Sequence, residues 1–122
     1  NKDLIFVVLP LTEMENAAKN LDLKYACEIF ADRNYEDNGH LVSRSKENAS
    51  VIDPKIASSN ILEMLDKSYI KCYTGKKIKC DIDTICIHGD GNKALLIAEN
   101  LKKSLLQNNI QLLSLNKLKK FQ

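Results

Sequence analysis

The residues best suited to chemistry lie in one short stretch, residues 83–94, which contains His88 and Asp90. β-Branched residues before His88 predict a buried strand, and apolar residues at helical spacing from residue 94 onward predict a helix. Gly89 and Gly91 interrupt these patterns, so they predict a sharp turn that carries both polar side chains. In parallel α/β folds, ligands bind at the carboxyl ends of the strands, which is where this turn would lie. We therefore expect the functional site in this turn.

His88 is the natural general acid or base of this stretch, since an ordinary histidine exchanges protons near neutral pH. The alternative is a purely structural histidine. Asp90 could orient the imidazole or bind a metal, and its side chain could also cap the following helix. Backbone N–H groups from Gly91 to Lys93 are expected to form an anion site at the helix start. Cys86 is expected to be a buried thiol rather than a nucleophile, because no cation lies obviously near it.

A second group of polar residues follows the strand predicted at residues 25–30. Asp32 and Arg33 leave this strand at the same edge of the sheet as the first group. Arg33 and Arg44 suit bidentate binding of a carboxylate or phosphate, and Tyr35 could close over a ligand. The structural alternatives are that Asp32 pairs with Arg33 or Arg44 to fix the long loop, and that Tyr35 anchors this loop.

The remaining patterns predict the elements that would position these residues. A continuous apolar run predicts a first strand covered on both faces, and Thr12 with Glu15 form a capping box at the start of a helix. Asp53 as N-cap and Pro54 at the first helical position begin a second helix. In chain order we expect a strand at 4–9, a helix, a strand at 25–30, a polar loop at 31–51, a helix from Pro54, a surface hairpin at 69–80, the strand before His88, a helix from Ala94, a strand at 110–115 and a frayed basic tail from Asn116. The apolar stripe expected on the first helix consists of Met14, Ala17, Ala18 and Leu21. The residues expected to be buried on the second helix are Ala57, Ile61, Met64 and Leu65.

Strands that alternate with helices predict an α/β fold with a mostly parallel sheet. Four such strands are about half of an eight-stranded (β/α) barrel of roughly 250 residues. The chain does not begin with Met, and an apolar strand lies almost at its first residue. We therefore expect residues 1–122 to form one α/β domain, the C-terminal half of a larger (β/α) barrel whose N-terminal part is missing. Such a fragment is a candidate homo-oligomer.

Composition narrows the possible partners and location. The 122 residues carry a formal net charge of +2, which is too small to imply nucleic acid, and the lysines near the C-terminus are expected to form a solvated face. The four cysteines form no CxxC pair, and no histidine lies at zinc-finger spacing from them. A signal peptide or an apolar run of membrane length is not found, so the expected location is the cytoplasm, with reduced thiols and no membrane contact.

Three segments, taken together and in order, resemble one known family. Residues 30–35 read Phe-Ala-Asp-Arg-Asn-Tyr, residues 39–44 read Gly-His-Leu-Val-Ser-Arg, and residues 83–90 read Asp-Thr-Ile-Cys-Ile-His-Gly-Asp. This set is similar to the LamB/YcsF family, the A subunit of bacterial 5-oxoprolinase, from about residue 29 to residue 110. Two features depart from the family: Gly91 and Asn92 replace its usual Asn-Pro, and the acidic motif of its N-terminal half has no counterpart here.

The resemblance implies a partial (β/α) barrel of the glycoside hydrolase/deacetylase type. It also implies a hydrolase that opens 5-oxoproline (pyroglutamate) to L-glutamate, with ATP used together with the B and C subunits. The chain could be inactive without the N-terminal half, and its metal use is unknown. The expected site consists of the catalytic residues His88, Asp90 and Asp32 and the substrate-binding residues Arg33, Arg44, Tyr35, Gly89 and Gly91.

Two other classes of function remain open from the sequence. One is a metal-dependent hydrolase or deacetylase that acts on a carbohydrate. It would need a His/Asp metal cluster, for which two histidines are too few without the missing N-terminal half. The other is a non-catalytic module that binds an anion or docks on a partner chain. Bound metal would favour the deacetylase, and strict dependence on ATP and partner subunits would favour the oxoprolinase.

Overall fold

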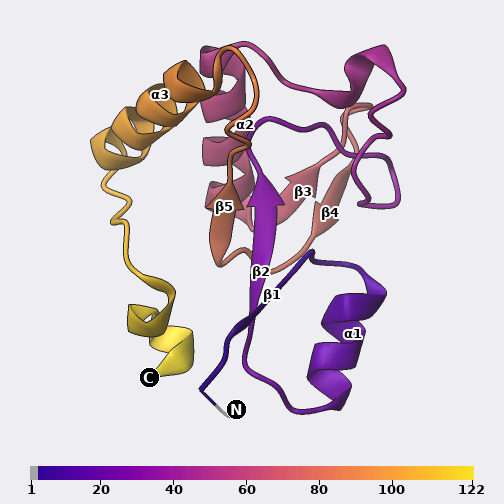
Figure 1. Cartoon of the computed structure of the whole chain (residues 1–122), viewed down its shortest axis with the longest axis vertical. Coiled ribbons are helices and arrows are strands. Elements are labelled where there is room, and N and C mark those ends of the chain that lie inside the picture. The colour runs from indigo at the N-terminus through magenta and orange to yellow at the C-terminus, as the bar shows by residue number, and fades with distance from the viewer. Residues whose placement is uncertain (1–2) are drawn as a thin grey trace.

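The computed structural model describes residues 3–122 of the chain. Strands and helices alternate over most of its length, as the sequence predicts (Figure 1). In chain order the elements are β1 (Phe6–Val8), α1 (Glu13–Asn20), β2 (Tyr25–Phe30), η1 (Glu47–Ala49), α2 (Pro54–Lys67), β3 (Tyr69–Lys71), β4 (Lys77–Lys79), β5 (Thr84–Cys86), α3 (Ala94–Gln107), η2 (Leu115–Lys117) and η3 (Lys119–Phe121).

The main sheet has three parallel strands in the order β1-β2-β5, which confirms the α/β class. The first half of β2 pairs with β1, from Tyr25 to Cys27, and its second half pairs with β5, from Glu28 to Phe30. This stagger between neighbouring strands is the arrangement that a closed barrel requires. β5 is half-buried rather than fully buried, because one of its edges has no strand beside it among the described residues.

Helices α2 and α3 pack against each other and cover one face of the sheet (Figure 1). α2 begins where the sequence predicts, because the Asp53 side chain accepts hydrogen bonds from the backbone N–H groups of Lys55 and Ile56. Its apolar stripe packs on Ile29 of β2 and on the stripe of α3. The residues buried on these helices are Ala57, Ser58, Ile61 and Met64 of α2 and Ile97, Leu101 and Leu105 of α3.

The hairpin of β3 and β4 confirms the prediction for residues 69–80 and joins the core more closely than a surface hairpin would. Tyr69 and Ile70 are buried in the same cluster as Ile61 of α2. Glu63 of α2 fixes the hairpin to the helix, because it accepts hydrogen bonds from Tyr69 and Lys71 at 2.5 and 2.7 Å. The hairpin therefore extends the core beyond the parallel sheet.

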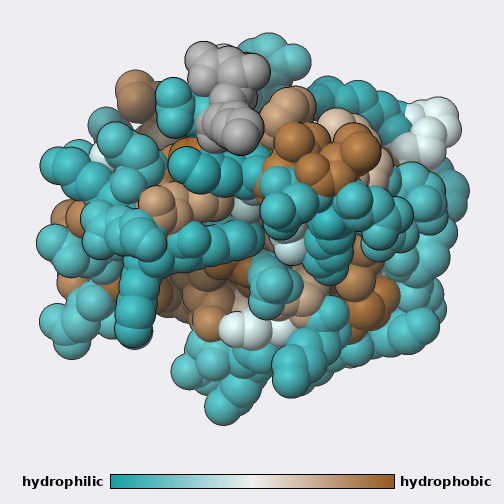
Figure 2. All heavy atoms as spheres, turned by 90° about the horizontal axis from the view of Figure 1, so that it is seen from below, coloured by the Kyte–Doolittle hydropathy of each residue, from teal (hydrophilic) through white to brown (hydrophobic). Residues whose placement is uncertain are grey.

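The first strand differs from its prediction. It spans Phe6–Val8 rather than residues 4–9, and only Val8 is buried. β1 lies at an edge of the sheet, so it has one neighbouring strand among the described residues instead of two. Leu4, Phe6 and Val7 are exposed in consequence. Seen from below, apolar side chains form open patches among hydrophilic ones (Figure 2).

The capping box and apolar stripe predicted for α1 are wrong. Thr12 is the N-cap residue, yet its hydroxyl donates to the carbonyl of Leu9 and makes no cap bond. The carboxylate of Glu15 accepts from the N–H of Leu11 at 2.7 Å, one residue before the N-cap, and it is buried beside the thiol of Cys27. The stripe residues Met14, Ala17 and Leu21 are exposed, whereas Ala18 is buried.

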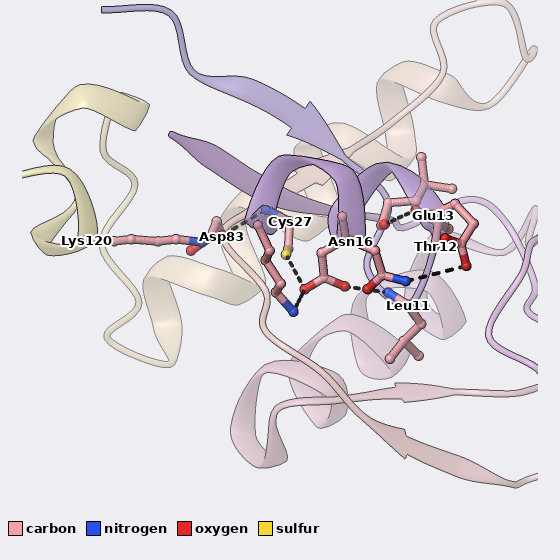
Figure 3. Close-up of polar contacts among 10 residues, drawn as sticks. Leu11, Thr12, Glu13, Asn16, Cys27, Asp83 and Lys120 are labelled. Atoms are coloured by element: carbon pink, nitrogen blue, oxygen red, sulfur yellow. Dashed lines mark hydrogen bonds and ion pairs between the residues drawn. The ribbon is translucent and has the colours of Figure 1, made fainter. Parts of the chain in front are cut away.

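The C-terminal segment also departs from its prediction. Residues 110–114 form no β-ladder, although their apolar pattern is typical of a strand. The basic tail is folded rather than frayed, because η2 and η3 turn it back towards the sheet and Lys120 forms an ion pair with Asp83 at 2.6 Å (Figure 3). No helix within residues 3–122 is long and apolar enough to cross a membrane.

Candidate active site

Asp32 and His88 lie side by side although 56 residues separate them in the chain. The register of the parallel sheet explains this, because Phe30 of β2 pairs with Cys86 of β5. Each of the two polar residues follows its paired strand residue by two positions, on the same face of the chain. The fold therefore brings an acid and an imidazole together at the carboxyl end of the sheet, where the sequence placed the site.

The two side chains form a close pair. Nδ1 of His88 lies 3.0 Å from both carboxylate oxygens of Asp32, and the backbone N–H of His88 donates to Oδ2 at 3.0 Å. A carboxylate only accepts hydrogen bonds, so Nδ1 is the donor of this contact, and in the neutral tautomer that the contact selects Nε2 carries the lone pair. This pair can accept a proton at Nε2 while Asp32 stabilises the imidazolium that forms.

A cavity of about 260 Å³ opens beside the pair, between the long loop, the turn that follows His88 and the first turn of α3. Three cationic side chains line it, those of Arg33, Arg44 and Lys93. The acids that line it are Asp32 and Asp90. The excess of cations suits a ligand with a carboxylate or phosphate group.

Arg33 fixes the long loop, but through partners other than those expected. Its buried guanidinium donates from Nε to the carbonyl of Ala49 at 3.2 Å and from Nη2 to that of Val42 at 2.6 Å. The expected pairing of Asp32 with Arg33 or Arg44 is wrong, because Asp32 is held by His88. Arg33 has no acidic partner within 4 Å among residues 3–122, so no carboxylate neutralises its charge beside the cavity that it lines.

The other two loop candidates differ in their access to the cavity. Arg44 is exposed, lines the cavity and forms no ion pair with the rest of the described chain. Tyr35 is buried, and its hydroxyl oxygen accepts from the backbone N–H of Phe30 at 2.8 Å. Burial raises the pKa of Tyr35. These contacts favour the anchoring role of Tyr35 over contact with a ligand.

The turn after His88 is open to solvent. Asp90 lines the cavity, but it is not the helix cap, because α3 begins after Lys93 and has no side-chain cap. A Cβ atom added at Gly89 or Gly91 would meet nothing within 4 Å, so a ligand can approach the backbone of this turn. No group of three or more metal-ligating side chains occurs in the described part of the chain.

The thiols near the sheet are unsuited to nucleophilic attack. Burial, followed by the charges of Glu28 and Asp32, raises the pKa of Cys86. Burial also raises the pKa of Cys27 to about 12, with Glu15 as the next cause. All four cysteines are free. Cys86 is half-buried rather than buried as predicted, and its raised pKa argues against a nucleophile.

Sequence reasoning missed the side chain of Lys93 and the pairing partner of His88. Lys93 lines the cavity one position before α3, where only its backbone was expected to act. The available signal was its place just before the helical pattern, since residues there face the carboxyl edge of the sheet. The signal that could have paired Asp32 with His88 was that each follows the end of its strand by the same number of residues.

Comparison with known proteins gives consistent matches over nearly the whole chain. The sequence pattern of the LamB/YcsF family matches residues 1–120. A Clostridium beijerinckii protein, named as the A subunit of 5-oxoprolinase, is 43% identical over 118 residues, which are 97% of this chain and 46% of that protein. A Nitrobacter hamburgensis protein of the same name is 43% identical over 108 residues, 88% of this chain and 42% of the relative.

One solved structure extends this likeness to three dimensions. The crystal structure of a lactam utilization protein from Thermus thermophilus superposes with a TM-score of 0.79 and 29% sequence identity. The superposition covers 89% of this chain and 43% of the Thermus chain. The chain described here spans about half the length of the curated relatives that it matches.

Proposed function

The chain belongs to the LamB/YcsF family, and from this premise we propose that it takes part in the hydrolytic ring opening of 5-oxoproline to L-glutamate. The family membership confirms the resemblance carried by the three motifs. The names of the relatives, the A subunit of 5-oxoprolinase and a lactam utilization protein, support a lactam as the substrate class. The companion subunits of the proposed complex are those of the B and C type.

The hydrogen-bonded pair of Asp32 and His88 is the observation that carries the proposal. A water molecule that attacks the lactam carbonyl must lose a proton, and Nε2 of His88 is the free base beside the cavity. The C–N bond then breaks, and the imidazolium returns its proton to the leaving nitrogen. Asp32 keeps Nδ1 protonated throughout and stabilises the positive ring.

The cations of the cavity supply the second requirement, a place for the substrate carboxylate. Arg44 and Lys93 are accessible at its rim, and the N–H groups at the start of α3 carry the positive end of the helix dipole. Arg33 holds the loop that carries Arg44, through the carbonyl groups of Val42 and Ala49. We assign Arg44 and Lys93 to the substrate anion and Arg33 chiefly to the shape of the cavity.

ATP enters the proposal as a co-substrate of the complete enzyme. A five-membered lactam loses amide resonance when it is attacked, so prior transfer of a phosphoryl group from ATP to the lactam oxygen, with release of ADP, would lower the barrier. The transferred group then leaves as inorganic phosphate by hydrolysis after the ring has opened. In this proposal the activation step involves the partner subunits, and no residue of this chain is assigned to ATP. What this chain supplies is the acid–base pair and the anion site for the ring-opening step.

Reconstitution tests the reaction and its requirements together. The complete protein that carries this chain is assayed for glutamate formed from 5-oxoproline, with ATP, the B-type subunit or the C-type subunit omitted in turn. We expect glutamate only from the full mixture. Glutamate formed without ATP would contradict the activation step, and metal-dependent release of acetate from an acetylated sugar would replace the oxoprolinase hypothesis by the deacetylase one.

A further inference from the structure

The imidazole of His88 is held on a second side by an aromatic ring. The ring centroids of Phe30 and His88 lie 5.3 Å apart, and their planes differ by 12°, so the two rings are stacked. Phe30 is the last residue of β2 and is 8% exposed. It does not line the cavity beside His88, so its ring supports the imidazole without reaching a ligand there.

Asp32 alone leaves one motion of the imidazole unrestricted. Its two oxygens lie at the same distance, 3.0 Å, from Nδ1. A contact of this kind fixes the position of Nδ1 but resists only weakly a swing of the ring about that nitrogen. The flat face of Phe30 opposes such a swing, because a tilted imidazole would lose the stacked contact or collide with the phenyl ring.

Phe30 is itself held in place from the long loop. Its backbone N–H donates to the hydroxyl oxygen of Tyr35 at 2.8 Å, and the next N–H, of Ala31, donates to the carbonyl of Cys86 at 3.0 Å. Tyr35 is 2% exposed. A rigid connection therefore runs from the buried Tyr35 through the end of β2 to the face of the imidazole.

From this geometry we propose that Phe30 is a positioning residue, which stacks on His88 and keeps Nε2 directed at the cavity. The inference rests on the proposed role of His88 as the acid–base group. A stacked aromatic pair contributes enough to change a rate by between about twofold and about tenfold. Since Phe30 acts through His88 and not on the substrate, its loss should lower kcat and leave KM nearly unchanged.

The test compares three variants of the complete protein. Phe30→Leu keeps an apolar side chain but removes the flat ring, and Phe30→Tyr keeps the ring. Ile29→Val is the matched control, because Ile29 is the neighbouring buried residue of β2 and points to the other face of the strand. Each variant is assayed for kcat and KM with the partner subunits, at a temperature where all variants are folded.

A second readout does not depend on the substrate. The Nδ1–H proton of His88 is followed by NMR with ¹⁵N-labelled histidine, and its signal is identified by its absence from His88→Asn. We expect Phe30→Leu to speed the exchange of this proton and to lower kcat by about two- to tenfold. We expect Phe30→Tyr and Ile29→Val to keep both near the parent values.

The proposal is overturned if Phe30→Leu matches Ile29→Val both in kcat and in the exchange of the Nδ1–H proton. Failure of the proposed function looks different. The complete protein would then not open 5-oxoproline at all, while the proton exchange would still report whether the Phe30 ring holds the imidazole.

Discussion

Two aspartates at opposite ends of the same sheet lie in nearly equal surroundings. The Asp32 side chain is 14% exposed and pairs with His88, which is 30% exposed. The Asp83 side chain is 13% exposed and pairs with Lys120, which is 34% exposed. Each aspartate also accepts a backbone N–H. Asp32 accepts from His88 itself, and Asp83 accepts from Cys27, as Figure 3 shows. The two pairs differ in the cation and in what lies beside it.

The pair of Asp83 and Lys120, at the amino end of the sheet, is not suited to acid–base catalysis. Lys120 lies over the ring of Tyr25 at 4.4 Å in addition to its bond to Asp83. Burial alone would lower the pKa of Lys120, but the carboxylate of Asp83 outweighs burial and raises it. Because its pKa is raised, the ammonium group of Lys120 stays protonated near neutral pH and cannot act as a base. His88 keeps one nitrogen free beside a cavity. We therefore attribute stability to the amino end and the proposed catalysis to the carboxyl end, the division of roles that is general in (β/α) barrels.

The same substitution at the two aspartates separates these roles and has the largest expected effect. Asp32→Asn removes the charge that keeps Nδ1 of His88 protonated, so turnover should fall by at least about 100-fold with little change in unfolding temperature. Asp83→Asn should leave turnover near the parent value and lower the free energy of unfolding by about 1 kcal/mol. Equal losses of turnover in both variants would remove the distinction between the two ends.

Replacing each of the two loop arginines by lysine distinguishes a side chain that binds the substrate from one that holds the loop at the carboxyl end of the sheet. Arg44 is exposed at the cavity, so Arg44→Lys should raise KM about tenfold and leave stability unchanged. Arg33→Lys should instead lower the unfolding temperature by several degrees, because a point charge cannot reach the carbonyl groups of Ala49 and Val42 together. Thermal melts and steady-state kinetics of both variants check this, and a reversed pattern would make Arg33 the substrate ligand.

Removing the cation at the amino end has a smaller effect. Lys120→Met keeps much of the apolar stem and loses both the ion pair with Asp83 and the contact with the Tyr25 ring. We expect the free energy of unfolding to fall by about 1 kcal/mol in urea melts. Lys119→Met, one residue earlier in an exposed position, is the matched control. If the Lys120 variant were as stable as the control, the C-terminal segment would not stabilise the amino end of the sheet through Lys120.

The smallest expected effect lies outside both ends, at the junction of α2 and the hairpin. Hydrogen bonds from Lys71 and then from Tyr69 lower the pKa of Glu63 from 4.5 to about 2. A carboxyl group whose folded pKa is depressed stabilises the fold above its unfolded pKa and loses that contribution as the pH falls. Stability should therefore decline between pH 4.5 and about 2. In Glu63→Gln this part of the pH dependence should flatten, and an unchanged curve would assign it to other acids.

Local signals in the sequence were sufficient for several elements. The start of α2 follows from Asp53 and Pro54, whose capping chemistry needs no distant partner. β2 follows from its own apolar residues, since strands lie on both of its sides. The strand expected at residues 110–115 failed for the opposite reason. Its pattern is suitable, but a strand also needs a ladder partner in register, and the pattern does not specify one.

The sequence predicted which edge of the sheet the candidate residues share, but not how they pair. The sequence indicated that Asp32 and His88 share one edge of the sheet, yet it offered Asp90 to orient the imidazole and an arginine to pair with Asp32. Only the register of Phe30 with Cys86 decides between these pairings, and register is a long-range property. The buried Glu15 is another case, because its partners Leu11 and Cys27 come together only in the folded chain.

The most direct test of the account is the turnover of His88→Asn beside that of His40→Asn, in the complete protein with its partner subunits, ATP and 5-oxoproline. Asn keeps approximate size and hydrogen bonding but cannot relay a proton at neutral pH. His40 is an exposed histidine of the long loop and does not line the cavity, so its replacement controls for loss of an imidazole. We predict that His88→Asn loses about two to four orders of magnitude in glutamate production while it unfolds near the parent temperature, and that His40→Asn keeps parent turnover. A His88→Asn variant with more than about a tenth of parent turnover would contradict the acid–base role of the pair.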